Sequence, residues 1–312
     1  MKCSRLSHVC IYTAIHIRIH VVMWIYSDMH RLKVISVRGG GYDGPTDFKD
    51  DSEVVMQTVA VCNQKGGVCK TTTVAAVSSS VAARGARVLC VDLDPQGNLT
   101  DVLGETTYDR DTVYEVLMGN ADIAETIVHR EGADLLPAEI TLASAEKELL
   151  GVLNGPARLK KALAKVADDY DLCVIDCSPS LGLLVTMALT AADYVVIPTT
   201  SSFLATKGIT QLAQTIADVR EFTNPGLQVA GILLTKYHRQ TNNAKVSIVE
   251  AETMASALNC KLFSTKIREA VKVEEAHASG KPIVEFAPTS APARDYESFV
   301  DELLTDMGWT SE

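Results

Sequence analysis

A glycine-rich run that separates an apolar stretch from a helical pattern is the segment best suited to chemistry. It reads Asn63-Gln64-Lys65-Gly66-Gly67-Val68-Cys69-Lys70-Thr71-Thr72-Thr73. Backbone N–H groups of such a loop, together with the positive end of the helix that follows, hold anionic phosphate. We therefore expect a phosphate cradle made of Gly66, Gly67, Val68, Cys69, Lys70, Thr71 and Thr72.

Two side chains of this loop have distinct expected roles. Lys70 would reach the β- and γ-oxygens of a nucleotide, and Thr71 would ligate Mg²⁺. The usual pattern G-x-x-x-x-G-K-[ST] is incomplete, because Gln64 and Cys69 occupy its two glycine positions. The alternative is a glycine-rich turn that binds nothing, and the motifs further along the chain argue against it.

Aspartates end two other apolar runs. These are Val91-Asp92-Leu93-Asp94-Pro95-Gln96-Gly97-Asn98 and Leu172-Cys173-Val174-Ile175-Asp176-Cys177-Ser178-Pro179-Ser180-Leu181-Gly182. Each aspartate alone would be interpreted as a loop or capping residue. Three motifs at the ends of three predicted strands instead indicate one site, since ligands bind beyond the carboxyl ends of parallel strands. Such carboxylates supply the positioning and charge neutralisation that phosphoryl transfer needs.

The three motifs together resemble those of the ParA/MinD family. Residues 65–72 resemble its deviant Walker A box, K-G-G-V-G-K-T-T, in which Lys65 matches the additional early lysine. Residues 92–98 match its D-x-D-P-Q-G-N box, which favours the chromosome and plasmid partitioning branch, and residues 172–182 resemble its Walker B region. The resemblance covers about residues 56–304, including 267–276 and 280–283.

The resemblance implies roles for individual residues. Lys65 would cross a dimer interface to the partner subunit's ATP, and Asp94 would orient or polarise the attacking water. Asp92 would support the magnesium shell, while Asp176 would hold Mg²⁺ through a water. Lys65, Lys70 and Asp94 are thus the expected catalytic residues of an ATPase that uses ATP and Mg²⁺ and forms a homodimer on binding ATP.

Cys69 departs from the family pattern. A glycine there lets the backbone approach phosphate and adopt torsions that a Cβ resists, at about 1–2 kcal/mol for a left-handed residue. We expect Cys69 to weaken nucleotide binding. Beside Lys70 at a helix start, its thiol could also have a lowered pKa and act as a redox gate. The simpler alternative is a tolerated small residue.

The elements that must position these motifs follow from the apolar pattern. Short continuous apolar runs suit strands buried on both faces, and helical patterns lie between them, as at Ile209, Leu212, Ile216 and Val219. The alternation predicts an α/β doubly wound, mostly parallel sheet with helices on both faces, as in P-loop NTPases. The predicted strands are Thr58–Asn63, Val88–Asp92, Leu172–Asp176, Tyr194–Ile197 and Val229–Thr235.

Residues 1–55 differ in character from the rest. They hold four of the seven histidines, and the apolar part, residues 8–26, is interrupted by Arg18 and two histidines, which disfavours a membrane span or signal segment. Residues 15–21 alternate with strand period but have no obvious partner. We interpret 1–55 as an extension of unknown order, which could be translated upstream of a start at Met56, and 56–312 as the ATPase domain.

Charge limits the possible partners. The formal net charge is -10, so any contact with nucleic acid needs a local basic patch. Residues 236–281 hold eight Lys or Arg against five Glu. By the resemblance this region forms a face for nonspecific DNA, with Arg239, Arg268 and Lys272 at or next to basic family positions; Arg239 is offset by one residue. An ordinary solvated face is the alternative.

The resemblance also implies a ParB-like partner protein and a nucleoid-associated, cytoplasmic location. A reducing compartment agrees with eight cysteines that form no CxxC pair or zinc-finger spacing. Two other functions stay open. One is a MinD-like positioning ATPase, although the acidic end, residues 295–306, lacks the basic amphipathic helix that membrane binding requires. The other is a nucleotide-binding switch with little hydrolysis.

Overall fold

A computed structural model describes residues 21–26, 32–37, 56–200, 205–238 and 243–309 of the chain. The chain divides into two compact units, Met1–Glu53 and Val54–Glu312. In the first unit, β1 (Val21–Tyr26) pairs antiparallel with β2 (Leu32–Val37), with Val21 opposite Val37. The sequence analysis did not foresee this pairing, and most of its strand-like stretch, residues 15–20, lies outside the described residues.

The second unit contains a seven-stranded sheet in which every pair of neighbouring strands is parallel. The strand order is β5-β4-β6-β3-β7-β8-β9. The predicted parallel sheet is therefore confirmed. Its strands are β3 (Gln57–Val61), β4 (Val88–Leu93), β5 (Asp134–Leu136), β6 (Leu172–Cys177), β7 (Tyr194–Thr200), β8 (Gln228–Tyr237) and β9 (Leu262–Arg268).

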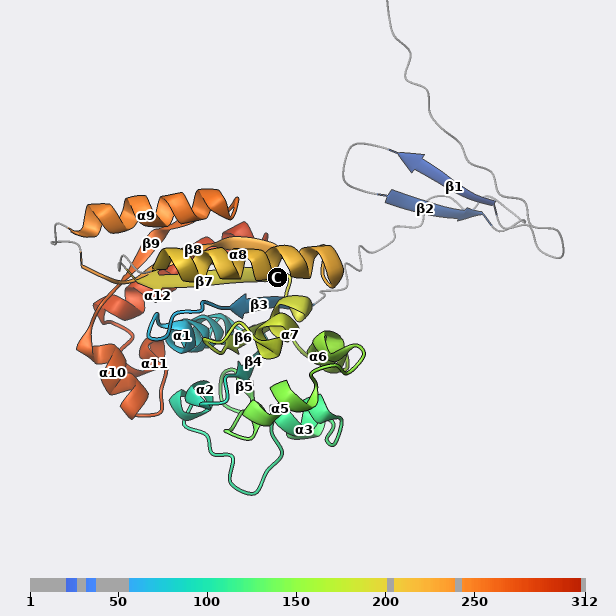
Figure 1. The fold of residues 1–312 in the computed structure, drawn as a ribbon, viewed down its shortest axis with the longest axis horizontal. Helices are drawn as coiled ribbons and strands as arrows, with labels where there is room; N and C mark the ends of the chain where they lie inside the picture. The colour runs from blue at the N-terminus through green and yellow to red at the C-terminus, as the bar shows by residue number, and fades with distance from the viewer. Residues whose placement is uncertain (1–20, 27–31, 38–55, 201–204, 239–242, 310–312) are drawn as a thin grey trace, which may run out of the picture. The chain divides into compact units, whose positions relative to one another are not determined.

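Helices cover both faces of this sheet (Figure 1). Those that matter most for the site are α1 (Lys70–Ala82), α2 (Asn98–Val102), α10 (Val271–Ala278) and α12 (Ala291–Asp306). The others are α3 (Val113–Met118), α4 (Ile123–Thr126), α5 (Leu142–Glu148), α6 (Arg158–Leu163), α7 (Leu183–Ala191), α8 (Ala205–Phe222), α9 (Asn243–Ala257) and α11 (Ile283–Phe286), with short 3-10 turns at Gly155–Ala157 and Ala167–Asp169.

Alternating side chains of the central strands pack into two hydrophobic cores, one on each face of the sheet. Val59 and Val61 of β3 pack in the core that contains α1 and α12, whereas Ala60 and Cys62 pack in the core that contains α7 and α8. Because both faces are buried, the strand sequences show continuous apolar runs instead of alternation. Within the described parts of the chain, no helix is long and apolar enough to cross a membrane.

The position of β3 decides where a ligand can bind. It lies between β6 and β7, and the chain leaves it for β4 on one side of the sheet and returns to β7 on the other. At such a switch point the loops after neighbouring strands diverge and open a crevice beyond the carboxyl ends. The glycine-rich loop follows β3 directly, so it lies at this crevice.

Candidate functional site

The glycine-rich loop is tied to the ends of β7 and β8. Asn63 donates from Nδ2 to the Pro198 carbonyl oxygen at 2.7 Å. Thr235 donates from Oγ1 to the carbonyl oxygens of both Val68 and Thr199, each at 3.1 Å. These side chains satisfy backbone carbonyls that a buried loop would otherwise leave unpaired, and they fix the loop before any ligand arrives.

The backbone of the loop turns through two left-handed residues before α1 begins. Gly67 has φ 71°, and Cys69 has φ 63° and ψ 33° at the N-cap position of α1. No side chain caps α1, so its first N–H groups are left for an anion. Thr73 holds the strained residue in place, since its Oγ1 donates to the Cys69 carbonyl oxygen at 2.7 Å.

The Cys69 thiol differs from the sequence expectation. Burial raises its pKa above the ordinary value, although the charge of Lys236 and a hydrogen bond with Thr235 partly oppose this effect. The expected lowered pKa is therefore wrong: desolvation outweighs the nearby cation. A thiol that stays protonated is a poor nucleophile, so the redox gate loses its physical basis.

Thr71 and Asp176 meet at the floor of the site. Thr71 donates from Oγ1 to Asp176 Oδ2 at 2.6 Å, while Asp176 Oδ1 is buried without a hydrogen-bond partner. Burial, and then the neighbouring charge of Asp92, raise the pKa of Asp176 well above its usual range. A buried carboxylate oxygen with no donor, next to a hydroxyl, fits a magnesium ion and its water ligands.

Asp92 is a buried residue near the carboxyl end of β4, just before the loop that follows this strand. Its Oδ2 accepts from both the backbone N–H and the hydroxyl of Thr100 at 2.9 Å, and its Oδ1 accepts from the N–H of Asp94 at 3.2 Å. Burial raises its pKa to about 6 despite these donors. The sequence analysis placed Asp92 in the magnesium shell; here its carboxylate is bonded to the 94–100 loop.

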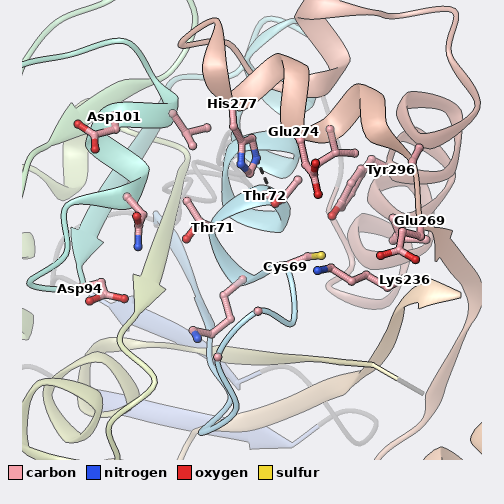
Figure 2. A pocket seen from close by; sticks show the side chains of 18 of the residues that line it. Cys69, Thr71, Thr72, Asp94, Asp101, Lys236, Glu269, Glu274, His277 and Tyr296 are labelled. Atoms are coloured by element: carbon pink, nitrogen blue, oxygen red, sulfur yellow. Dashed lines mark hydrogen bonds between the residues drawn. The ribbon is translucent and has the colours of Figure 1, made fainter. Parts of the chain in front are cut away.

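Asp94 itself faces the cavity, where Figure 2 labels it on the side of α1 that carries Thr71. Its Oδ1 accepts from the N–H of Gln96 at 3.0 Å, which orients the carboxylate. Among the described residues, no group of three or more His, Cys, Asp or Glu side chains has the arrangement of a metal site. A magnesium ion would therefore depend on Thr71, on Asp176 through water, and on ligand oxygens.

A cavity of about 520 Å³ is lined by Lys70, Thr71 and Asp94, whereas Asp92 and Asp176 are not among its lining residues. One wall is the glycine-rich loop with the first turn of α1, and a second comes from the ends of β8 and β9, from α10 and from α12 (Figure 2). The loop after β4 and helix α2 also contribute to the lining. Sequence reasoning missed the residues of the second wall. They include Lys236, Glu269, Glu274, His277 and Tyr296. The matched stretch 267–276 was a signal for this region, but a match alone does not reveal which residues face a ligand.

Lys65 has a partner within its own chain. It donates from Nζ to Thr200 Oγ1 at 3.1 Å, and its backbone N–H donates to Asn63 Oδ1 at 3.1 Å. It is not among the residues that line the cavity. A role on a second subunit therefore requires the ammonium to exchange Thr200 for another acceptor.

The basic residues expected at a DNA face are paired with carboxylates. Arg268 donates to Asp295 through Nε at 2.6 Å and through a terminal nitrogen at 2.7 Å, and Lys272 donates to Glu275 at 2.7 Å. Both basic side chains are about half exposed (55%). Arg239 lies outside the described residues.

Fold and site together define a P-loop nucleotide-binding protein: a parallel sheet, a glycine-rich loop between its central strand and a helix, and a lysine, a threonine and aspartates at the carboxyl edge. Residues 56–229 match a family whose description is AAA domain. The chain is 41% identical to the sporulation initiation inhibitor protein Soj of Bacillus subtilis, over 80% of this chain and 98% of that protein.

Two further similarities agree with this match. The chromosome partitioning protein ParA of Caulobacter vibrioides is 37% identical over 80% of this chain and 94% of its own length. A structure named cobyrinic acid a,c-diamide synthase, from Mycobacterium smegmatis with a bound ATP analogue and magnesium, is 38% identical with a TM-score of 0.72, over 81% and 96% of the two chains. The chain belongs to the ParA/Soj family of P-loop ATPases.

Replacing Cys69 by glycine tests the backbone strain. Removing the left-handed Cβ relieves about 1–2 kcal/mol, and the greater freedom of glycine in the unfolded chain offsets about 0.5–1 kcal/mol of that gain. We expect Cys69→Gly to unfold at higher denaturant concentration and to bind ATP more tightly, as measured by chemical denaturation and calorimetry. Cys69→Ala, which keeps the Cβ and loses the thiol, is the control. Equal gains in both variants would assign the effect to the thiol.

Proposed function

We propose that this protein is a MgATP-dependent dimerising ATPase that binds nonspecific DNA and drives the partitioning or positioning of chromosome or plasmid DNA. The observation that carries the proposal is the arrangement of Lys70, Thr71 and Asp94 around one cavity at the start of α1, with Asp176 hydrogen-bonded to Thr71. The similarity to Soj and ParA, which are named for sporulation control and chromosome partitioning, also supports a role in partitioning.

Each residue of the site has a distinct part in the proposed hydrolysis. The N–H groups of the loop and the Lys70 ammonium bind the β- and γ-phosphates, and Thr71 with Asp176 holds the metal. Magnesium, when bound, neutralises charge on the phosphate oxygens. Asp94, oriented by the Gln96 N–H, positions the attacking water. Asp92 keeps the 94–100 loop in register and so supports the metal site indirectly.

The proposed dimer forms around ATP. Lys65 lies in the loop but does not line its own cavity, which is consistent with an ammonium that serves the partner subunit's nucleotide. The residues beyond Met56 form one unit that contains every motif, so we assign the ATPase domain to residues 56–312. We further infer a ParB-like partner protein and a cytoplasmic, nucleoid-associated location from the family.

One observation favours a second candidate, a nucleotide-binding switch that hydrolyses little. Cys69 puts a Cβ on a left-handed position of the phosphate loop, where a glycine would be unstrained. If the strained loop holds the γ-phosphate poorly, ATP could bind without efficient turnover. A MinD-like membrane role lacks comparable support, because α12 at the end of the described chain carries acidic residues on its exposed side.

Substitutions at Lys70 and Asp94 should impair different steps, ATP binding in the first case and ATP hydrolysis in the second. Lys70→Ala removes the cation that holds phosphate, so ATP affinity should fall by at least about tenfold, as expected for a charged hydrogen bond. Asp94→Asn should bind ATP normally and lose most turnover, because only the water-positioning group changes. Calorimetry and phosphate release measure the two quantities. Hydrolysis at the parent rate in both variants would refute the site assignment, and ATP binding without turnover in the parent would favour the switch.

Dimerisation should require ATP and Lys65. Light scattering with a slowly hydrolysed ATP analogue should detect a dimer that is absent without nucleotide. Lys65→Ala should lower the dimer fraction more than it lowers nucleotide affinity, since the ammonium acts across the interface. Lys160→Ala, an exposed lysine on α6, is the control. An unchanged dimer in all samples would contradict the ATP-dependent interface.

DNA binding should depend on Arg268 and Lys272. Exposed ion pairs contribute only about 0–1 kcal/mol, so phosphate can replace Asp295 and Glu275 as the acceptor. Arg268→Gln with Lys272→Gln should weaken binding to a random duplex and lower the slope of log affinity against log salt by up to about 0.9 per lost contact. Lys160→Gln with Lys161→Gln removes equal charge from α6 as the control. Absence of DNA binding by the ATP-bound parent at low salt would remove DNA from the proposal.

A further inference from the structure

The second wall of the cavity contains a histidine that contacts the phosphate loop helix. His277 comes from α10, and its Nε2 lies 3.2 Å from Thr72 Oγ1 in the first turn of α1. Both residues line the cavity. Figure 2 shows the imidazole reaching Thr72, with the hydrogen bond between them dashed.

The charge state of His277 follows from its surroundings. Burial lowers its pKa below the ordinary value, an effect that the charge of Glu274 only partly opposes. A neutral imidazole has one nitrogen that donates and one that accepts. Nε2 is engaged by Thr72, whereas Nδ1 has no hydrogen-bond partner among the described residues. Either tautomer thus leaves one polar ring atom for a ligand.

The order of residues along the loop indicates which part of a nucleotide this atom meets. In a P-loop the backbone of the cradle, here Gly66 to Lys70, takes the α- and β-phosphates, the lysine reaches the β- and γ-phosphates, and the hydroxyl that follows takes the metal. Thr72 is the next residue on α1, and the cavity extends past it from the cradle to α10, so the part of a nucleotide beyond its phosphates would lie there. His277 lies beyond Thr72, on the opposite wall.

We propose that His277 binds the ribose of the nucleotide and, through Thr72, holds the first turn of α1 in position. Ribose hydroxyls both donate and accept, so they match Nδ1 in either tautomer. The side chain therefore discriminates ribose from sugars that lack hydroxyls. This inference rests on the proposed ATP binding and adds a specificity-determining residue to the same site.

The test compares ATP with 2′,3′-dideoxy-ATP in equilibrium binding by calorimetry, which needs no turnover. The full-length parent should bind ATP about threefold to tenfold more tightly than the dideoxy analogue, the range for one net hydrogen bond. His277→Ala should bind both equally, with weaker ATP affinity than the parent. His277→Gln, which keeps a polar group at this position, should retain part of the preference.

Val271→Ala is the matched control, because Val271 is exposed on the same helix and does not line the cavity. It should preserve the parent ratio. A parent that binds both nucleotides equally, or an Ala variant that keeps the parent ratio, overturns the inference while ATP binding stands. A parent that binds no ATP overturns the proposed function as well.

A second pair of variants covers the case in which His277→Ala does not fold. His277→Leu fills the space of the ring without a polar atom, so it should bind the two nucleotides equally, whereas His277→Gln should keep part of the preference for ATP. Retention of the full parent ratio by the Leu variant would overturn the inference, because the preference would then come from another group.

Discussion

Two buried carboxylates side by side are the constraint on which the rest of the site depends. Asp92 and Asp176 are paired residues of β4 and β6, and both are fully buried. Burial raises the pKa of both groups, to about 6 for Asp92 and well above its usual range for Asp176, where the charge of Asp92 adds to the effect. Such a pair is unfavourable unless cations compensate. The charge of Lys70 opposes the shift at Asp176, and a bound magnesium ion would add to this compensation. Binding of a cation at this position would therefore lower the free energy of the folded protein.

The parallel sheet creates this constraint and also makes it useful. Parallel register sets Val61 of β3 opposite Asp176 of β6, so the glycine-rich loop begins beside the aspartate that we propose as a metal ligand. Strands buried on both faces cannot shift register without moving polar residues into a core. The distance between the loop and the carboxylates therefore depends on hydrophobic packing far from any ligand, with Asn63 and Thr235 as local ties.

The sequence predicted the central strands and the phosphate loop because both have strong local signals: continuous apolar runs and a glycine-rich turn. The sequence analysis did not predict two strands of the sheet, β5 and β9. β5 has only three residues, and β9 mixes buried with exposed positions at an edge. The second cavity wall depends on how α10 packs against α2 and α11, which no local pattern encodes. The Cys69 thiol was misjudged because its burial, which comes from tertiary packing, outweighs the nearby charge.

The second wall has a further consequence for how nucleotide and DNA could influence each other. Arg268 ends β9 and lines the cavity, while its guanidinium pairs with Asp295 of α12; α10 begins soon after it and carries Lys272 and then His277. The same short segment thus contributes Arg268 and His277 to the cavity lining and carries the half-exposed basic groups of Arg268 and Lys272. A ligand that shifts α10 would change both surfaces together. Coupling of this kind needs a ligand contact that differs between two positions of α10. The Thr72–His277 hydrogen bond would carry such a shift, because it joins α10 to the helix that begins at the phosphate loop.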